Sequence, residues 1–321
     1  MQTYLKTRPV WAQFFLFLGM AAASFFIGSA VGVLILSKMT GIGLGQLRDP
    51  KAWDLASPAM LTFVRGMILI QFLFLFALPS LLFSYLSDKR PFHYLGLQAP
   101  GSSLYWLWAV LLIVVSYPFV EYVGYINQKI AVSAGGASWM KSLEEEAARQ
   151  IKFMLRERTP AELIKNLVFI SLFAGIGEEL FFRGILQRML IRATQSPWTG
   201  IVLAAAIFSA FHFQFYGFLP RLFLGVLLGA IYWFSGSLWA AMLAHFLYDA
   251  SVIVYLYFNP QDLQNADAAL IKGQEIQLLI GAMISLALTF VLLHRMQKKS
   301  VVSYEAVYND DFPKPKDDFS F

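Results

Sequence analysis

The sequence has no cysteine and few charged residues. Of its 321 residues 14% are Asp, Glu, Lys or Arg, against about 25% in a soluble globular domain, while 58% are hydrophobic and 30 are Phe. The absence of cysteine excludes disulfides, a thiol nucleophile and thiolate metal ligands. The scarcity of charge excludes an ordinary soluble domain and indicates a protein that crosses a membrane several times.

Basic tracts, internal repeats and low-complexity segments are also absent. The net charge of +5 is spread along the chain, so it indicates basic loops and ends rather than a surface for nucleic acid. We therefore expect the lipid bilayer as a partner and no nucleic acid. The apolar run at about residues 11–36 exceeds the roughly 7–15 apolar residues of a signal peptide and predicts a retained first span.

Eight apolar runs are candidates for membrane spans, each of which needs about 20 mostly apolar residues. They lie at about residues 11–37, 59–86, 104–126, 161–192, 198–215, 220–235, 237–257 and 274–295. They predict an all-α fold, a polytopic membrane helix bundle with about eight transmembrane helices in one domain. This domain is residues 1–296. The polar, proline-containing tail at 297–321 is expected to be disordered.

Basic residues near the two ends of the chain predict its orientation. Lys6 and Arg8 lie before the first span, and Arg295, Lys298 and Lys299 lie at the end of the last. This favours cytoplasmic termini, and an even number of spans agrees. The 127–160 loop carries six basic residues and favours the opposite orientation.

One segment of that loop has the periodicity of an amphipathic helix. Leu143, Ala147, Ile151 and Met154 form a single stripe between about residues 141 and 158. Two interpretations stay open: an interfacial helix that guides substrate, or a connecting helix packed on the bundle.

Three short patterns place ionisable side chains in the apolar C-terminal half. They are Glu178-Glu179-x-x-x-Arg183, Phe208-x-x-x-His212 and His245-x-x-x-Asp249. Each ionisable group costs about 2.5–3.5 kcal/mol at the centre of a membrane helix on insertion scales, so such a concentration suggests a polar site. Carboxylates combined with imidazoles point first to hydrolysis.

Helix geometry separates the expected roles of the two glutamates. Glu178 and Glu179 point about 100° apart, whereas Glu179 and Arg183 are four residues apart on one face. We expect Glu179 to pair with Arg183 and Glu178 to face a cavity, where a carboxylate removed from water suits a general base. A solvated Glu–Arg pair at a helix end is the alternative.

The other two patterns are less specific when each is taken alone. Phe208 lies one turn from His212 and can pack against its ring, but a lone histidine near a helix end is also common at interfaces. His245 and Asp249 share a helix face, so Asp249 can hold the imidazole in one tautomer, or both can bind a metal. A buried hydrogen-bonded pair that joins helices is the alternative. The rise of about 1.5 Å per residue makes a common intramembrane site feasible.

Together, in this order, the three patterns resemble the CPBP family of intramembrane endopeptidases (CAAX proteases and bacteriocin-processing enzymes, also called the Abi family). That family's pattern is EExxxR, then FxxxH, then Hxxx followed by Asn or Asp. The resemblance covers about residues 161–257, which would be the catalytic core.

The resemblance implies a role for each matched side chain. Glu178 would activate the attacking water with His212, while His245 and Asp249 would stabilise the oxyanion or complete a metal site. Arg183 would hold Glu179, and Phe208 would support the site. Asp249 stands where the eukaryotic prenyl-protein proteases carry Asn, and an Asp favours orienting the imidazole or binding a metal.

The resemblance also implies a substrate class and a location, while the mechanism stays open. The substrate would be a membrane-associated protein or peptide, lipidated in eukaryotic relatives, and the protein would lie in a bacterial cytoplasmic membrane. His212 and His245 with Glu178 or Asp249 could hold zinc and leave a position for water. The sequence has no HExxH, and a Glu–His pair can activate water without metal.

Two functions of other classes stay open. Glu, His and Asp within a membrane also relay protons, as in a proton-coupled transporter. A noncatalytic immunity or scaffold protein of the same fold is the third possibility.

Overall fold

The computed structural model describes residues 4–48, 53, 57–133, 138–263, 275–303 and 307. Every regular element in these residues is a helix. The first half contains η1 (Leu5–Thr7), α1 (Val10–Thr40), α2 (Pro58–Gln71), η3 (Phe72–Ala77), α3 (Leu78–Ser87), α4 (Pro91–Tyr94), α5 (Leu104–Ser133) and α6 (Ser138–Met154). The second half contains α7 (Pro160–Asn166), η4 (Leu167–Leu172), α8 (Phe173–Glu179), η5 (Leu180–Gln187), α9 (Arg188–Thr194), α10 (Pro197–Ala210), η6 (Phe215–Gly217), α11 (Phe218–Ser235), α12 (Leu238–Phe258), η7 (Pro260–Leu263) and α13 (Glu275–Lys299).

The predicted all-α membrane bundle is confirmed, but the count of eight spans is not. Six helical segments are long and apolar enough to cross a membrane: Val10–Thr40, Pro58–Ser87, Leu104–Ala131, Phe215–Ser235, Leu238–Phe258 and Glu275–Lys299. The other two predicted spans are also helical. Residues 160–194 form one run that carries the Glu and Arg side chains of the first pattern, and α10 is only 14 residues long.

Local sequence signals explain where several helices begin and end. Ser57, Thr159 and Ser196 each precede a proline at the first helical position, and each side chain accepts a hydrogen bond from a backbone N–H of the first turn. Gly41 and Gly236 end α1 and α11 with φ of 74° and 65°, a left-handed conformation in which glycine has no steric cost.

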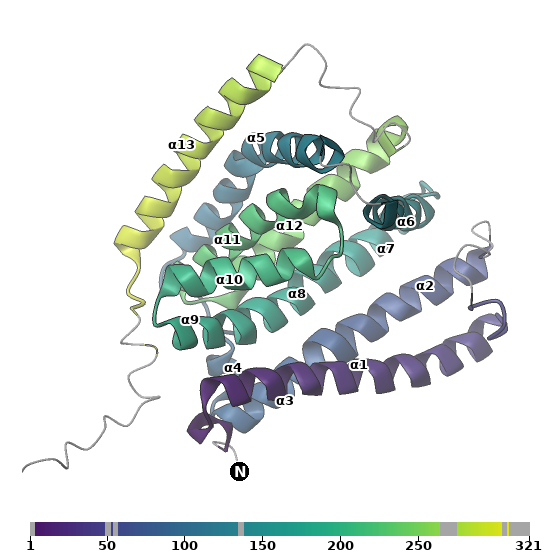
Figure 1. Cartoon of the computed structure of the whole chain (residues 1–321), viewed down its shortest axis with the longest axis horizontal. Helices are drawn as coiled ribbons and strands as arrows, with labels where there is room; N and C mark the ends of the chain where they lie inside the picture. Colours follow the sequence, from purple (N-terminus) through teal and green to yellow (C-terminus); the bar gives the residue numbers. More distant parts are fainter. Residues whose placement is uncertain are drawn as a thin grey trace, which may run out of the picture.

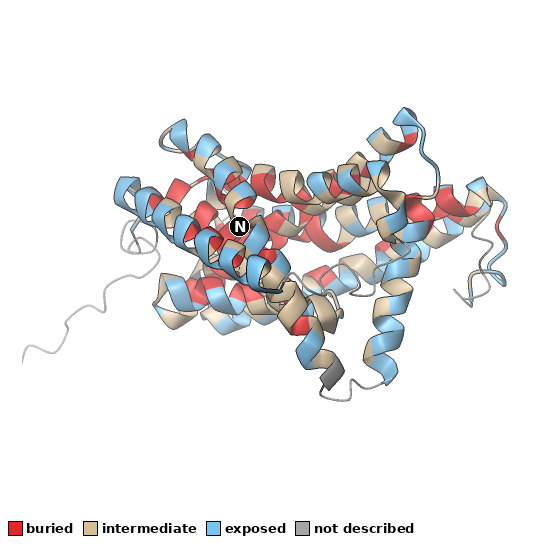
Figure 2. Ribbon diagram, turned by 90° about the horizontal axis from the view of Figure 1, so that it is seen from above, coloured by how far each residue is buried: buried red, intermediate tan, exposed pale blue. Residues whose placement is uncertain are grey.

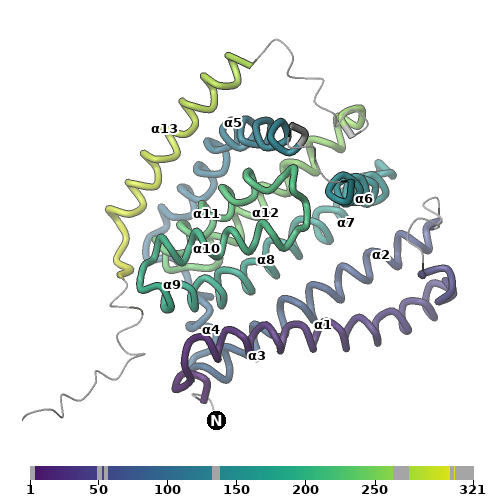
Figure 3. The backbone as a smooth tube through the Cα atoms, viewed as in Figure 1, coloured from purple at the N-terminus to yellow at the C-terminus, as the bar shows by residue number. Residues whose placement is uncertain are grey.

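The helices form three groups across the molecule (Figure 1). The hairpin of α1 with α2–η3–α3 lies on one side, and α13 packs along α5 on the other. Between them lie α8, α10, α11 and α12, and the tube in Figure 3 shows the same arrangement. Because α10 packs on α11 and α8 packs on α12, the segments that carry the three patterns are neighbours at the centre.

Burial follows this arrangement, with buried residues concentrated in the middle of the bundle (Figure 2). Only 17% of the apolar window of α1 and of α13 is buried inside the protein, against 44% for residues 215–235. The apolar faces of the two outer helices therefore contact lipid, as expected for an integral membrane protein.

The amphipathic segment forms α6, which ends at Met154 rather than at 158. Met154 is buried and Ile151 lines the central cavity, whereas Leu143 at the other end of the stripe is 38% exposed. At the C-terminus, α13 continues to Lys299, and most of the predicted tail, residues 304–306 and 308–321, lies outside the described residues. The domain boundary at 296 and the disorder of the tail stay predictions.

Candidate active site

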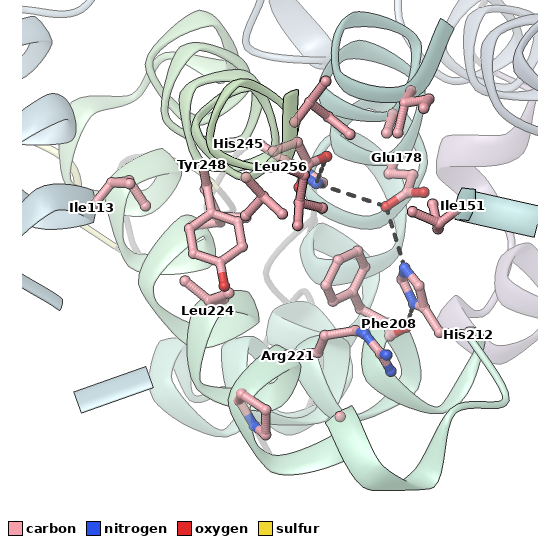
Figure 4. A pocket seen from close by; sticks show the side chains of 18 residues that line it. Ile113, Ile151, Glu178, Phe208, His212, Arg221, Leu224, His245, Tyr248 and Leu256 are labelled. Carbon is pink, nitrogen blue, oxygen red and sulfur yellow. Dashed lines mark hydrogen bonds and ion pairs between the residues drawn. The ribbon is translucent and has the colours of Figure 1, made fainter. Parts of the chain in front are cut away.

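The three patterns meet at one cavity of about 550 Å³ inside the bundle (Figure 4). Glu178 enters it from α8, His212 from the turn after α10, and His245 and Asp249 from α12. The remaining lining is mostly apolar. A second, smaller cavity of about 220 Å³ shares Glu178 with the first, so this carboxylate lies where the two meet.

Glu179 is the buried centre of the site. Its side chain is completely buried, and its Oε1 accepts hydrogen bonds from Arg183 Nη1 at 2.7 Å and from His245 Nδ1 at 2.8 Å. The expected pairing of Glu179 with Arg183 is therefore present. Arg183 also donates to the Gly225 carbonyl at 3.1 Å, and its guanidinium lies 4.5 Å from the centre of the Phe208 ring.

The imidazole of His245 is oriented by Glu179, a contact that the sequence did not suggest. Asp249 was expected to hold it, but the hydrogen bond at Nδ1 comes from Glu179, 66 residues earlier in the chain. Asp249 Oδ2 lies 3.5 Å from the other ring nitrogen, Nε2, which faces the cavity. The orienting role expected of Asp249 thus falls to Glu179, because α8 packs against α12.

Glu178 faces both imidazoles without touching either. Its Oε2 is 4.0 Å from His212 Nε2 and 3.9 Å from His245 Nε2, too far for a direct hydrogen bond, and its side chain is 14% exposed. His212 Nδ1 donates to the Phe208 carbonyl at 2.9 Å, since a carbonyl oxygen can only accept. The neutral imidazole therefore presents an unprotonated Nε2 towards Glu178. A water molecule that bridges these two atoms would have an acceptor on each side.

Phe208 packs as the sequence suggested. Its ring lies 5.0 Å from the ring of His212 and 5.9 Å from the ring of His245, edge-on in both cases. It therefore separates the two imidazoles on one wall of the cavity and limits their rotation.

The donor atoms of this site are not arranged as a zinc centre. Bonds of about 2.0–2.1 Å to a tetrahedral ion would place neighbouring ligand atoms about 3.4 Å apart. Only the 3.5 Å separation of His245 from Asp249 approaches this value, and both separations to Glu178 are larger. Across the described ranges, no group of three or more His, Asp or Glu side chains is suited to holding a metal ion. These donor atoms therefore do not fit a zinc ion in this arrangement.

Several residues of the site gave no signal in the sequence. Asn127 of α5 donates to the Phe215 and Tyr216 carbonyls at 2.7 and 2.8 Å, and Glu144 of α6 accepts from the Tyr216 backbone N–H at 2.9 Å. They fix the turn that follows His212. Arg221 lines the same cavity, as does Tyr248. A lone polar residue in a helix carries no pattern, so only the packing identifies these four.

The fold and the site together define the class of protein: an integral membrane helix bundle with a carboxylate–imidazole site in its interior. Residues 160–251 match the family model described as type II CAAX prenyl endopeptidase Rce1-like. The matched segment contains all three patterns, and the predicted resemblance to the CPBP family is confirmed for this part of the chain.

The chain is also similar to a curated protein. The chain is 33% identical over 100 residues to the uncharacterised protein YpbD of Bacillus subtilis (strain 168). The alignment covers 30% of this chain and 48% of the relative, so the chain spans about half the length of the relative it matches. No solved structure matches.

Proposed function

We propose that this protein is an intramembrane endopeptidase that hydrolyses a peptide bond in a membrane-associated protein or peptide. The observation that carries the proposal is the placement of Glu178 Oε2 at 4.0 and 3.9 Å from the two imidazole Nε2 atoms. This arrangement opens into a cavity lined mostly by the segment that matches a CAAX-type prenyl endopeptidase. The protein would act in a bacterial cytoplasmic membrane with both termini in the cytoplasm.

In the proposed reaction, Glu178 and His212 activate a water molecule that lies between them. The carboxylate takes a proton from the water as its oxygen attacks the carbonyl carbon of the substrate. Holding water and substrate together in this mostly apolar cavity supplies the orientation that the step needs. The proton then passes to the leaving amine when the tetrahedral intermediate collapses.

His245 would stabilise the oxyanion in this scheme. Glu179 and Asp249 flank its ring with negative charge, which favours the imidazolium. In that form Nε2–H points into the cavity and can donate a hydrogen bond to the oxyanion. Glu179 and Arg183 position the imidazole and do not react themselves.

The test is the variant Glu178→Gln, which keeps the shape of the side chain and removes the base. We expect proteolysis of a reconstituted membrane substrate to fall by about 100-fold or more, the usual contribution of a general base. Glu145→Gln on the exposed face of α6 is the matched control, since its partner is the exposed Lys141, and it should remain active. Wild-type turnover by a folded Glu178→Gln protein would overturn the assignment.

A further inference from the structure

Another cavity, with a different chemistry, lies at the end of the bundle where α1 begins. Its volume is about 310 Å³, and its lining includes Lys6 before α1, Asp88 and Arg90 after α3, and Arg188 at the start of α9. Figure 1 shows α9 beside the start of α1. Lys6 and Arg188 also line a narrow extension of this cavity, to which α9 contributes Arg192. Cationic side chains from three separate segments therefore converge on one space.

Positive charge exceeds negative charge around this cavity. Asp88 is the one acidic residue among the described residues that line it, and its Oδ1 accepts a hydrogen bond from the Arg90 backbone N–H at 2.8 Å. The Arg188 guanidinium lies over the Tyr94 ring, 4.5 Å from its centre. A guanidinium stacked in this way keeps its N–H groups in the plane of the fork that matches a phosphate. These side chains favour an anion with several oxygen atoms.

Backbone hydrogen bonds hold part of the cavity wall in a fixed shape. The Leu238 N–H donates to the Gly96 carbonyl at 2.8 Å, Ser237 Oγ donates to the Gln98 carbonyl at 2.6 Å, and Gln98 Nε2 donates to the Gly236 carbonyl at 3.2 Å. These bonds tie the segment after α4 to the turn between α11 and α12. Because residues of both segments line the cavity, its shape is set by packed backbone as well as by side chains.

Tryptophan side chains place this end of the bundle at a membrane surface. Trp11, Trp198 and Trp239 are the second residues of α1, α10 and α12, which all begin at this end, and they are 53%, 44% and 44% exposed. Trp233, near the end of α11, lines the cavity itself. Tryptophan is enriched at the level where lipid headgroups meet water. Lipid headgroups are therefore the phosphates nearest to the cavity.

We propose that this cavity binds the phosphate of an anionic phospholipid headgroup. Basic pockets between transmembrane helices recognise such headgroups on the cytoplasmic side of a membrane, the side on which the proposed orientation places these residues. A zwitterionic headgroup fits less well, because its ammonium group would meet the same cations. The cavity shares no described lining residue with the carboxylate–imidazole site, so the inference does not depend on the proposed peptidase activity.

A soluble phosphate ester offers the same chemistry, so the experiment separates the two sources. The full-length protein is freed of lipid in a neutral detergent at about 0.15 M salt, where exposed charges more than about 8 Å apart are largely screened. Dioleoylphosphatidylglycerol, dioleoylphosphatidylcholine and glycerol phosphate are titrated in turn. Native mass spectrometry counts the bound molecules and gives the affinity, and thermal unfolding is followed on the same samples.

We expect one phosphatidylglycerol to bind per chain, about 10-fold or more tightly than phosphatidylcholine or glycerol phosphate, and to raise the unfolding temperature. Arg188→Gln should weaken this binding by about 10- to 100-fold, the effect of losing hydrogen bonds from a charged group. Arg90→Gln should weaken it by about fivefold, the effect of one basic residue near a membrane surface. Arg8→Gln is the matched control, since Arg8 is exposed at the same end and does not line the cavity, and its affinity should match wild type.

The variants and the soluble ester decide between a built site and general attraction to charge. Equal affinity for the two lipids, or equal affinities of Arg90→Gln and Arg8→Gln, would contradict the inference. Glycerol phosphate that binds as tightly as phosphatidylglycerol would mean that a soluble ester is the ligand and would overturn the lipid assignment.

Two further results would also be decisive. If Arg188→Gln does not fold, Arg90→Gln and Lys6→Gln decide the question, because the first changes an exposed side chain and the second lies before α1. Absence of bound phosphatidylglycerol on the wild-type protein would overturn the inference and would favour an acidic segment of the chain as the partner of these cations. No cleavage is measured, so failure here leaves the proposed peptidase function standing.

Discussion

At the scale of single residues, one oxygen atom of Glu179 connects both halves of the site. It accepts from Arg183 on its own helical run and from His245 on α12, while the side chain is completely buried. A buried carboxylate with two such partners fixes the rotation of α8 against α12. Glu178, the next residue, is turned towards the cavity as a consequence.

The first prediction compares the two members of the buried ion pair. Arg183→Ala and Glu179→Ala should each destabilise the protein by about 3–5 kcal/mol, because each leaves a buried charge without its partner. Only Glu179→Ala also releases His245, so it should lower activity more than Arg183→Ala. Thermal unfolding in detergent and a cleavage assay provide the two measurements.

A double-mutant cycle tests the coupling of this pair. The variant without both side chains should lose less stability than the sum of the two single losses, since neither charge is then left unpaired. Simple additivity would show that the pair contributes no coupling free energy.

The second prediction concerns metal. Because Glu178 and His212 are placed to activate water themselves, cleavage should persist after chelation in a preparation without stoichiometric transition metal. Elemental analysis and activity are measured on the same sample. One zinc per chain, together with loss of activity on chelation and recovery on adding zinc, would replace this mechanism by the zinc mechanism that the sequence left open.

At the scale of helices, close approach of α8 and α12 sets the catalytic distances. A Cβ on Gly175 would lie 3.0 Å from the backbone N of Phe246 and 3.3 Å from the Met242 carbonyl oxygen. Gly175 is three residues before Glu178, and Phe246 directly follows His245. The absence of a side chain at one position therefore brings the carboxylate and the imidazole to 3.9 Å.

The third prediction tests this contact. Gly175→Val should push α8 away from α12, destabilise the protein by about 1–3 kcal/mol and abolish most of the activity, because a packed backbone cannot move aside cheaply. Gly19→Val is the matched control: a Cβ there meets nothing within 4 Å, so stability and activity should change little. Full activity of Gly175→Val would show that the site tolerates separation of these helices.

A second contact between elements joins the N-terminal hairpin to the helix that carries Glu178. Arg65 of α2 donates to Glu162 at 2.6 Å and to Asn166 Oδ1 at 2.8 Å, both on α7. Lys165 contacts the other oxygen of Glu162 at 2.7 Å. The two ends of this ion pair therefore differ: Glu162 contacts two cations, Arg65 and Lys165, whereas Arg65 contacts a single carboxylate.

The fourth prediction uses this asymmetry. Glu162→Leu should destabilise the protein more than Arg65→Leu, since it leaves the buried Arg65 without a carboxylate, whereas Arg65→Leu leaves Glu162 paired with Lys165. Thermal unfolding of the two variants in detergent measures the ranking. The reverse order would mean that Asn166 alone satisfies Arg65.

At the scale of the whole molecule, the site lies towards the end of the bundle that is far from the start of α1 and the end of α13. Lys6 and Val302 line one common cavity, and Gly101 approaches Val301, so the start of α1 and the end of α13 lie near the start of α5. Asn127, which fixes the turn after His212, lies about 35 Å further along that helix. The orientation in the membrane thus decides from which side a substrate reaches the site.

The fifth prediction tests this orientation by labelling single introduced cysteines. The wild-type protein has no cysteine, so it is the unlabelled control. If both termini are cytoplasmic, the cysteines of Arg8→Cys and Lys298→Cys should react with a membrane-impermeant maleimide only after the cells are permeabilised. Glu145→Cys on exposed α6 should react in intact cells. The reverse pattern would place the site on the cytoplasmic side.

From the amino-acid sequence alone, the helices and the three patterns that meet at the cavity were predictable. Apolar runs placed a helix at each expected position, and Ser or Thr before Pro marked where several begin. Contacts within one helix were also predictable, as for Glu179 with Arg183 and Phe208 with His212, because helix geometry fixes which residues four apart can meet.

The contacts between helices, by contrast, depend on how the helices pack. The bond from His245 to Glu179 spans 66 residues and that from Arg65 to Glu162 spans 97. Such pairs depend on the rotation and separation of packed helices, which side-chain sterics set at positions such as Gly175. For the same reason, no local pattern showed that Glu179 rather than Asp249 would accept the hydrogen bond from His245 Nδ1, or that Arg221 would line the cavity.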